Sequence, residues 1–443
     1  GDVEVIEVTG KHVHSDIKVV GKFNCSNEIL NKLHNMAVIT EQNNQYSIMT
    51  DCPQRDERFG WLNDVSSRVF QSFDMDRLYN KVVHDIYETQ NEEGCIGDTA
   101  PYYTGGQPAD TTTVSYLLLA LSAYKYYGDD ALVKKEYEGH KKWVEYLLTR
   151  QKDFIMDYYY YADWVPPMTL KNSVSDGIFV SSMFLYWHLI TIAKLAKICG
   201  NCKDFEKYST LAKMSKDALN KKYYHQEGYY CNNTQCENAM PVWLGICEDN
   251  NKELVVKHIV KDIIDNNYHI TCGNQGYRHV FYLLAEYGYS DLAIKVLTNK
   301  EYPGWGYMVD SGATTVGKRW EKEMQNEMHS FDHPMFGSYD AIFYHYFLGI
   351  QVDGNGASDI TLHTYVPDSL DYANGEFKTI KGLIKVNWNK DLNNKLINYE
   401  YDVPTNTQAK LIVNKEIISL DGKKVQGNEF ILDGGKHILK TIL

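Results

Sequence analysis

The chain has 443 residues, a formal net charge of −13 at pH 7, and a composition that is 44% hydrophobic and 13% aromatic. This length predicts two or three domains with a large core. The acidic balance argues against nucleic acid or an anionic membrane as a partner, and no apolar run reaches the roughly 18 residues that a transmembrane helix requires.

The first part of the chain changes from β-like to helical patterning. Residues 1–24 contain short β-like runs (3–8 and 17–23) and predict a strand lead-in or the remnant of an upstream β domain. From residue 25 to about 350 the apolar residues recur with helical spacing. The predicted helices are 27–45, 62–90, 111–127, 130–150, 177–199, 203–223, 234–247, 250–264, 276–287, 289–299 and 334–349. Their lengths suit antiparallel hairpins, arranged as a closed ring or as an open solenoid.

After residue 350 the pattern becomes β-rich. Short alternating runs are separated by Asp-Gly, Asn-Gly and Gly-Gly turns. The predicted strands are 360–365, 377–386, 396–403, 409–413 and 437–443. We therefore expect a C-terminal antiparallel β-sandwich over residues 351–443.

The segment 51–64, which reads DCPQRDERFGWLND, connects two predicted helices. Crowded carboxylates shift one another's pKa values apart, so that one can be a protonated acid while another is ionised. A proton donor beside an indole suits glycoside cleavage. A solvated, ion-paired surface turn is the alternative, but Pro53, Gly60 and Trp61 constrain this segment more than such a turn needs.

This segment resembles the DCPQRDERxGWxxD signature of the bacterial α-L-rhamnosidases, glycoside hydrolase family 78. The resemblance covers nearly all of residues 20–350, and further matching segments in family order are 21–26, 162–164, 301–307, 311–315 and 330–333. It implies that residues 25–350 form an (α/α)6 barrel of the six-hairpin glycosidase type, mainly α, with a β-sandwich after it. The implied partner is a carbohydrate substrate.

The resemblance also implies roles for individual residues. Glu57 matches the general acid, and Asp51, Asp64 and Trp61 match residues that hold the sugar, although the two aspartates can also cap the flanking helices. The other expected substrate-binding residues are Arg55, Asp163, Trp164, Trp305, Lys318, Trp320 and His333. Core packing is the alternative for the tryptophans, and a structural role is the alternative for His333.

The segment that carries the family's general base differs in this chain. The family pattern is GATTxWERWD, whereas residues 312–321 read GATTVGKRWE, so Lys318 occupies the position of the base. An inverting glycosidase needs a second carboxylate about 6.5–9.5 Å from the acid. We expect Glu321 or Asp332 to replace it, with Glu323 on the same segment. The alternatives are a carbohydrate-binding pseudoenzyme, or a glycosidase in which Lys318 pairs with a uronate or sulfate on an anionic glycan.

Further inferences concern ligands and location. Asp110 either binds substrate or caps the helix that follows it. The chain shows neither a glycine-rich phosphate loop nor a ligand-spaced His/Cys cluster, so we expect no metal and no organic cofactor. Nine scattered cysteines indicate free thiols, and with no signal segment visible we expect a cytoplasmic protein. The predicted function is an inverting glycoside hydrolase that releases terminal α-L-rhamnose or a related deoxy-sugar.

Overall fold

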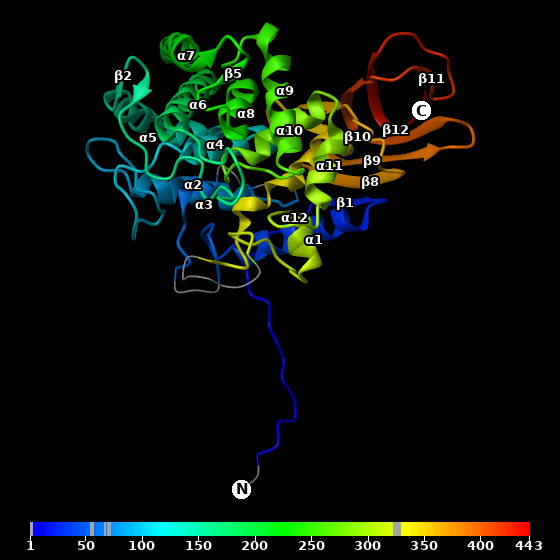
Figure 1. Ribbon diagram of the computed structural model, residues 1–443, viewed down its shortest axis with the longest axis horizontal. Coiled ribbons are helices and arrows are strands. Elements are labelled where there is room, and N and C mark those ends of the chain that lie inside the picture. Colours follow the sequence, from blue (N-terminus) through cyan, green and yellow to red (C-terminus); the bar gives the residue numbers. More distant parts are fainter. Residues whose placement is uncertain (1–2, 54–56, 66–67, 69–71, 322–328) are drawn as a thin grey trace.

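A computed structural model describes residues 3–53, 57–65, 68, 72–321 and 329–443 (Figure 1). A helical region fills the first three quarters of the chain and a β-sheet follows it. Residues 3–8, for which a strand was expected, are extended and exposed and form no strand, and this segment leads away from the body of the molecule. Its alternating apolar residues alone do not make a strand, because no other segment of the described chain pairs with it.

The helical region is built from consecutive antiparallel helices. They are α1 (Glu28–Asn43), α2 (Leu62–Val65), α3 (Asp76–Glu88), α4 (Ser115–Ser122), η1 (Ala123–Tyr127), α5 (Asp130–Thr149), α6 (Gly177–Ile198), α7 (Cys202–Tyr223), α8 (Gln235–Leu244), α9 (Asp249–Asp265), α10 (Tyr277–Glu286), α11 (Ser290–Thr298), α12 (Trp305–Asp310), η2 (Pro334–Phe336), η3 (Ser338–Asp340) and η4 (Phe343–Phe347). Two small hairpins, β2–β3 (Gln151–Lys152, Ile155–Met156) and β4–β5 (Tyr224–His225, Tyr229–Tyr230), lie in the connections.

Inner and outer helices alternate along the chain. Helices α4, α6, α8 and α10 are almost wholly buried, and each contacts the next in an inner layer. Helices α7 and α9 bury only one stripe and cover that layer from outside. Helix α6 is long and apolar enough to cross a membrane, but 83% of its apolar window is buried, so here it is a core helix. This arrangement is a closed ring of helical hairpins.

Three details differ from the expected helices. The predicted helix 62–90 is divided into α2 and α3, and Phe73 between them forms an isolated bridge with Val19. The predicted helix 334–349 is a series of 3-10 and π turns that begins at Pro334. Helix α12 was not predicted, because Gly304 and Gly306 weaken its helical signal.

The C-terminal strands form one mainly antiparallel sheet with a strand from the N-terminal region. The strands are β1 (Gly21–Cys25), β6 (Ile350–Asp353), β7 (Asp359–Leu362), β8 (Tyr372–Thr379), β9 (Gly382–Asp391), β10 (Leu396–Ile412), β11 (Ile417–Leu420) and β12 (Glu429–Ile442). Within the described chain the order is β1-β8-β9-β10-β12-β11, while β7 pairs with β6 and, in parallel, with β10. Strand β1 pairs with β8 from Gly21↔Phe377 to Cys25↔Ala373. Residues before the helical ring are therefore held by the sheet that follows it.

The predicted strand boundaries were partly wrong. Residues 377–386 are two strands, β8 and β9, which turn at residues 380–381. The predicted strands 396–403 and 409–413 are one strand, β10, with an irregularity between Val403 and Gln408. Trp388 of β9 is buried and its indole N–H donates to the Phe347 carbonyl of the ring at 2.8 Å, so this side chain fastens the sheet to the helices.

Candidate active site

The connection between α1 and α2 carries the acidic segment to one end of the helical ring. A buried ion pair holds the start of this connection against α1. Arg68 Nη2 lies 2.6 Å from Glu41 Oε1 of α1, and Arg68 Nη1 donates to the Thr50 carbonyl at 3.0 Å. At its far end, Trp61 forms a β-bridge with Thr99. The loop is thus tied both to α1 and to the connection between α3 and α4.

Glu57 is half-buried and is held by an aromatic side chain. The indole Nε1 of Trp61 donates a hydrogen bond to Glu57 Oε1 at 2.7 Å. The Trp61 ring is also half-buried and lies edge-on to Tyr161, with ring centroids 5.8 Å apart. Trp164 lies edge-on to the same tyrosine at 5.5 Å. These three rings form an aromatic row beside the glutamate, which suits stacking against the apolar face of a sugar.

Two buried aspartates face one histidine next to this row. His333 Nε2 lies 3.8 Å from Asp51 Oδ2 and 3.6 Å from Asp64 Oδ2. His333 Nδ1 accepts the N–H of Met335 at 3.3 Å, so in the neutral ring the proton is on Nε2 and points toward the carboxylates. Asn274, from the connection before α10, donates to Asp64 Oδ1 at 3.1 Å.

Lys318 is brought to this cluster by the loop that precedes η2. Its backbone N–H donates to the Ser330 carbonyl at 2.7 Å, and the His333 N–H donates to the Val316 carbonyl at 2.8 Å. The side chain is 5% exposed. Burial raises the pKa of Asp64 to about 6, while the positive charges of Lys318 and Arg68 act against that rise. Lys318 therefore lies within electrostatic reach of the Asp64 carboxylate.

The structure thus brings seven of the predicted site residues together: Asp51, Glu57, Trp61, Asp64, Trp164, Lys318 and His333. Sequence reasoning missed Tyr161, Asn274 and Cys52. The Cys52 thiol lies 3.4 Å from Asp51 Oδ2 and 4.0 Å from Glu57 Oε2. The position of Cys52 inside the signature was a usable signal, whereas nothing in the local sequence marks Asn274.

Asp163, expected to bind substrate, instead holds a loop. Its carboxylate accepts the N–H groups of Gly273, Gln275 and Gly276 at 2.7, 3.1 and 3.0 Å. Burial raises its pKa to about 6, against the effect of those N–H donors. Three backbone donors occupy both carboxylate oxygens, and they position the loop that presents Asn274. The expectation of direct sugar contact is corrected accordingly.

Two of the predicted sugar-stacking tryptophans are core residues. Trp305 is 1% exposed, and its indole N–H donates to the Phe336 carbonyl at 2.9 Å. Trp320 is 4% exposed and packs edge-on against Trp305, with ring centroids 4.9 Å apart. Both rings belong to an aromatic cluster with Tyr277 and Phe336, so core packing, and not stacking on sugar, explains them.

The two candidate bases lie in different surroundings. Glu321 Oε2 is 3.3 Å from Arg319 Nε, which partly neutralises it. Asp332 accepts hydrogen bonds from the side-chain amides of Asn43 and Asn44, at 2.5 and 3.2 Å. Burial raises the pKa of Asp332 to about 6, and the two amides act against that rise.

Other predicted residues either have a structural role or lie outside the description. Asp110 accepts the N–H groups of Thr112, Tyr160 and Tyr161 at 2.9, 2.5 and 3.1 Å, so it joins two loops and starts the turn before α4. Asp110 therefore has a structural role in this turn, but it is not the N-cap of α4, which begins after Val114 and has no side-chain cap. Arg55 and Glu323 lie outside the described residues.

Metal binding has one geometric candidate in the part of the chain that the structure describes. Ligand atoms of Asp51, Cys52 and Glu57 lie within 4.8 Å of one another. Asp51 Oδ2 faces His333 Nε2 at 3.8 Å and Glu57 Oε1 accepts the Trp61 N–H at 2.7 Å, so both carboxylates already have partners in the site.

A ring of helical hairpins with a glutamate, two aspartates and an aromatic row at one end defines a glycosidase of the six-hairpin class. The chain matches the bacterial alpha-L-rhamnosidase 6 hairpin glycosidase domain over residues 18–347, and the bacterial alpha-L-rhamnosidase C-terminal domain over residues 349–427. The protein therefore belongs to the bacterial α-L-rhamnosidase family. The resemblance and the fold class expected from the sequence are both confirmed.

Relatives and solved structures agree with this assignment. The chain is 26% identical over 435 residues to an alpha-L-rhamnosidase of Formosa agariphila, which covers 94% of this chain and 46% of that protein. The structure of an alpha-L-rhamnosidase from Dictyoglumus thermophilum superposes with a TM-score of 0.92 at 33% identity, over 98% of this chain and 52% of that one. The Streptomyces avermitilis alpha-L-rhamnosidase complexed with L-rhamnose has the same fold, with a TM-score of 0.88 at 22% identity over 97% of this chain and 43% of that one. The chain spans about half the length of the curated relatives it matches.

Proposed function

We propose that this protein hydrolyses terminal α-L-rhamnosides, or glycosides of a closely related deoxy-sugar, with inversion of configuration. The observation that carries the proposal is the hydrogen bond from Trp61 to Glu57 beside the buried carboxylates of Asp51 and Asp64. A half-buried glutamate held at one oxygen can present the other to the leaving-group oxygen as a general acid. Asp51 and Asp64 supply acceptors for sugar hydroxyls, and the aromatic row supplies an apolar face for the ring.

We propose Asp332 as the general base, because it directly precedes His333, whose ring faces Asp51 and Asp64. Burial also raises the pKa of Asp332 to about 6, near the pH at which a base must be ionised and still take a proton from water. Glu321 is a weaker candidate, because its ion pair with Arg319 lowers the basicity of the carboxylate. The amides of Asn43 and Asn44, at the end of α1, fix the orientation of Asp332.

A second candidate function is sugar binding without turnover. It is favoured by one observation, the lysine at position 318 where the family resemblance expects the base. Recognition of an anionic glycan has less support. The charge of Lys318 is already within reach of the Asp64 carboxylate, so it needs no anionic substrate to offset it.

Hydrolysis of an aryl α-L-rhamnoside by the purified chain tests the proposal. We expect turnover that yields β-L-rhamnose first, as followed by proton NMR, and a loss of about 10²–10⁴-fold in kcat for Glu57→Gln. Glu253→Gln, a neutralisation on the exposed face of α9, is the matched control. If calorimetry detects binding of L-rhamnose but no turnover is measured, the protein binds the sugar without hydrolysing its glycosides.

The base assignment has a separate test. Asp332→Asn should lose most of its activity and regain part of it when azide is added, because azide attacks without needing a base. The product should then be β-L-rhamnosyl azide. An unchanged rate in Asp332→Asn would remove Asp332 from the mechanism.

A further inference from the structure

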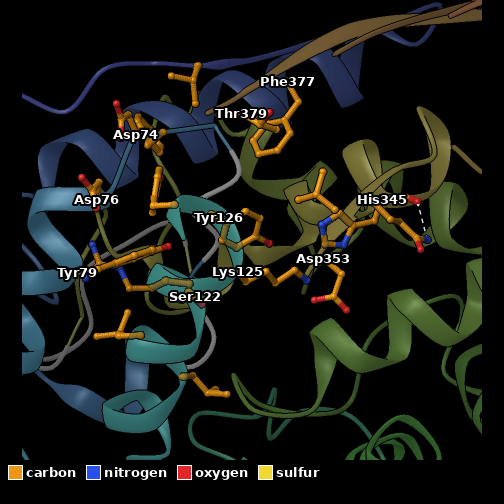
Figure 2. Close-up of a pocket in the computed structure, with 18 of the residues that line it drawn as sticks. Asp74, Asp76, Tyr79, Ser122, Lys125, Tyr126, His345, Asp353, Phe377 and Thr379 are labelled. Atoms are coloured by element: carbon orange, nitrogen blue, oxygen red, sulfur yellow. Dashed lines mark hydrogen bonds between the residues drawn. The ribbon is translucent and has the colours of Figure 1, made fainter. Parts of the chain in front are cut away.

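A cavity of about 750 Å³ lies inside the helical ring, at the end next to the C-terminal sheet (Figure 2). Residues of the inner helices α4, α6, α8 and α10 form its walls, and β6 and β8 contribute to its mouth. Among the residues that the structure describes, its lining does not include Asp51, Glu57, Asp64 or His333. The cavity is therefore distinct from the candidate active site.

One face of α10 lines this cavity along its length. Arg278, Tyr282 and Glu286 are spaced by four residues and all belong to the lining. With a rise of about 1.5 Å per residue, Arg278 and Glu286 are separated by about 12 Å along the helix. Glu286 instead accepts the hydroxyl of Tyr346 at 2.6 Å. The carboxylate on this face is thus too distant to neutralise the guanidinium.

Arg278 has no acceptor in the described chain. Its Nε is fully buried without a hydrogen-bond partner, and no described carboxylate lies within ion-pair distance of its guanidinium. Arg68, which also lines the cavity, contrasts with it because Arg68 is paired with Glu41 at 2.6 Å. Burial of an uncompensated guanidinium with five N–H donors is costly, so a ligand in the cavity that supplied acceptors would be strongly favoured.

A second cation and a neutral histidine lie on the same lining. Lys125 of η1 lies near both His345 of η4 and Asp353 of β6 in the view of the cavity (Figure 2). The pKa of His345 is lowered to about 3, first by burial and then by the positive charges of Lys125 and Arg278. Both cations therefore act on one region of the cavity. Besides Glu286, four acidic groups line the same cavity: Asp74, Asp76, Asp353 and Asp359.

We propose that this cavity binds a small oxyanion of the phosphate or sulfate class on the guanidinium of Arg278, with Lys125 as the second cation. The planar guanidinium offers two parallel donors that match two oxygens of such an anion. Trp187, Trp243 and Tyr282 form an aromatic wall beside it. A wall of this kind excludes water and strengthens the charge interaction.

Thermal unfolding of the full chain in phosphate, sulfate or chloride at matched ionic strength tests the site. We expect a saturable rise in Tm with phosphate or sulfate and none with chloride, and comparison of the two oxyanions shows which is preferred. Equilibrium dialysis with labelled phosphate should give one anion per chain. Arg278→Gln should weaken binding by about tenfold or more, as expected for loss of a charge-assisted hydrogen bond.

Arg77→Gln is the matched control, because it removes the same charge from the exposed face of α3. If Arg278→Gln fails to fold, Arg278→Lys and Lys125→Gln take its place. Each should weaken phosphate binding by several-fold, since the first loses the planar fork and the second loses a cation. The proposal is wrong if the wild type shows no saturable oxyanion effect. It is also wrong if these variants bind phosphate as well as Arg77→Gln does.

Discussion

The indole Nε1 of Trp61 lies 2.7 Å from Oε1 of Glu57, four residues earlier in the chain, and donates a hydrogen bond to it. The same indole ring meets Tyr161 edge-on and so belongs to the aromatic row of the site. One side chain therefore both orients the proposed acid and offers a surface for the sugar. A substitution that keeps the ring but removes the N–H can therefore distinguish the effect of the hydrogen bond from the effect of the aromatic surface.

Trp61→Phe keeps an aromatic ring but removes the N–H donor. We expect kcat to fall by about tenfold, the value of a hydrogen bond of about 1.5 kcal/mol to a charged group, with little change in KM. Steady-state kinetics on an aryl α-L-rhamnoside provide the measurement. Trp164→Phe is the control, because the Trp164 indole makes no hydrogen bond within the described chain. Equal losses of kcat in both variants would contradict the orienting role of Trp61.

Lys318→Glu replaces a cation near Asp64 with an anion. The Asp64 carboxylate would lose one of the charges that favour its ionised form, so its pKa should rise further and sugar binding should weaken. We expect kcat/KM to fall by about tenfold or more, and Lys318→Arg, which keeps the charge, to retain more activity than Lys318→Met. A many-fold rise of kcat/KM in Lys318→Glu would contradict this prediction. It would show that the wild-type site lacks a working base and would support the sugar-binding alternative.

The titration of Asp64 predicts a pH-dependent stability. Burial raises its pKa from 3.8 to about 6, so the folded state holds this proton more tightly than the unfolded chain does. That added stability is present below about pH 4 and is lost as pH rises through about 6. Relative to Asp64→Asn, the wild-type free energy of unfolding should fall by about 3 kcal/mol between about pH 3 and pH 7.

Urea denaturation across this pH range measures the difference, and Asp217→Asn on the exposed face of α7 is the control. A difference between wild type and Asp64→Asn that does not vary with pH would show that Asp64 does not titrate in this way. The same variants separate stability from function. Asp64→Asn should lose activity at every pH, because the amide cannot replace a charged acceptor for sugar hydroxyls.

Trp305→Ala tests the reassignment of this residue to the core. The ring is buried in an aromatic cluster and its N–H is bonded to the Phe336 carbonyl. Its removal should lower the free energy of unfolding by about 3–5 kcal/mol. Trp164→Ala, at a half-buried position, should cost less stability and raise KM more. A raised KM with unchanged stability in Trp305→Ala would restore its role in sugar stacking.

The local sequence pattern was sufficient to predict the helices and contacts that depend on residues close together in the chain. The apolar spacing predicted α1, α5, α7 and α9 to within a few residues, because a helix that buries one face shows that face as a repeat along its own sequence. The signature around Glu57 likewise marked the site, since the Trp61 donor and its acceptor lie only four residues apart in sequence. These interactions are short-range, so the sequence contains them directly.

The remaining features depend on which distant segments meet. His333 reaches Asp51 and Asp64 across more than half the chain, and Asn274 reaches Asp64 from another loop. Asp163 looked like a sugar ligand, but the structure supplies three backbone N–H groups that need an acceptor there. Packing of the whole chain determines whether a polar group is buried and which partners it has. The local sequence pattern cannot predict either property. For the same reason, only the tertiary structure showed that Lys318 lies near Asp64 and that Arg278 lines an interior cavity.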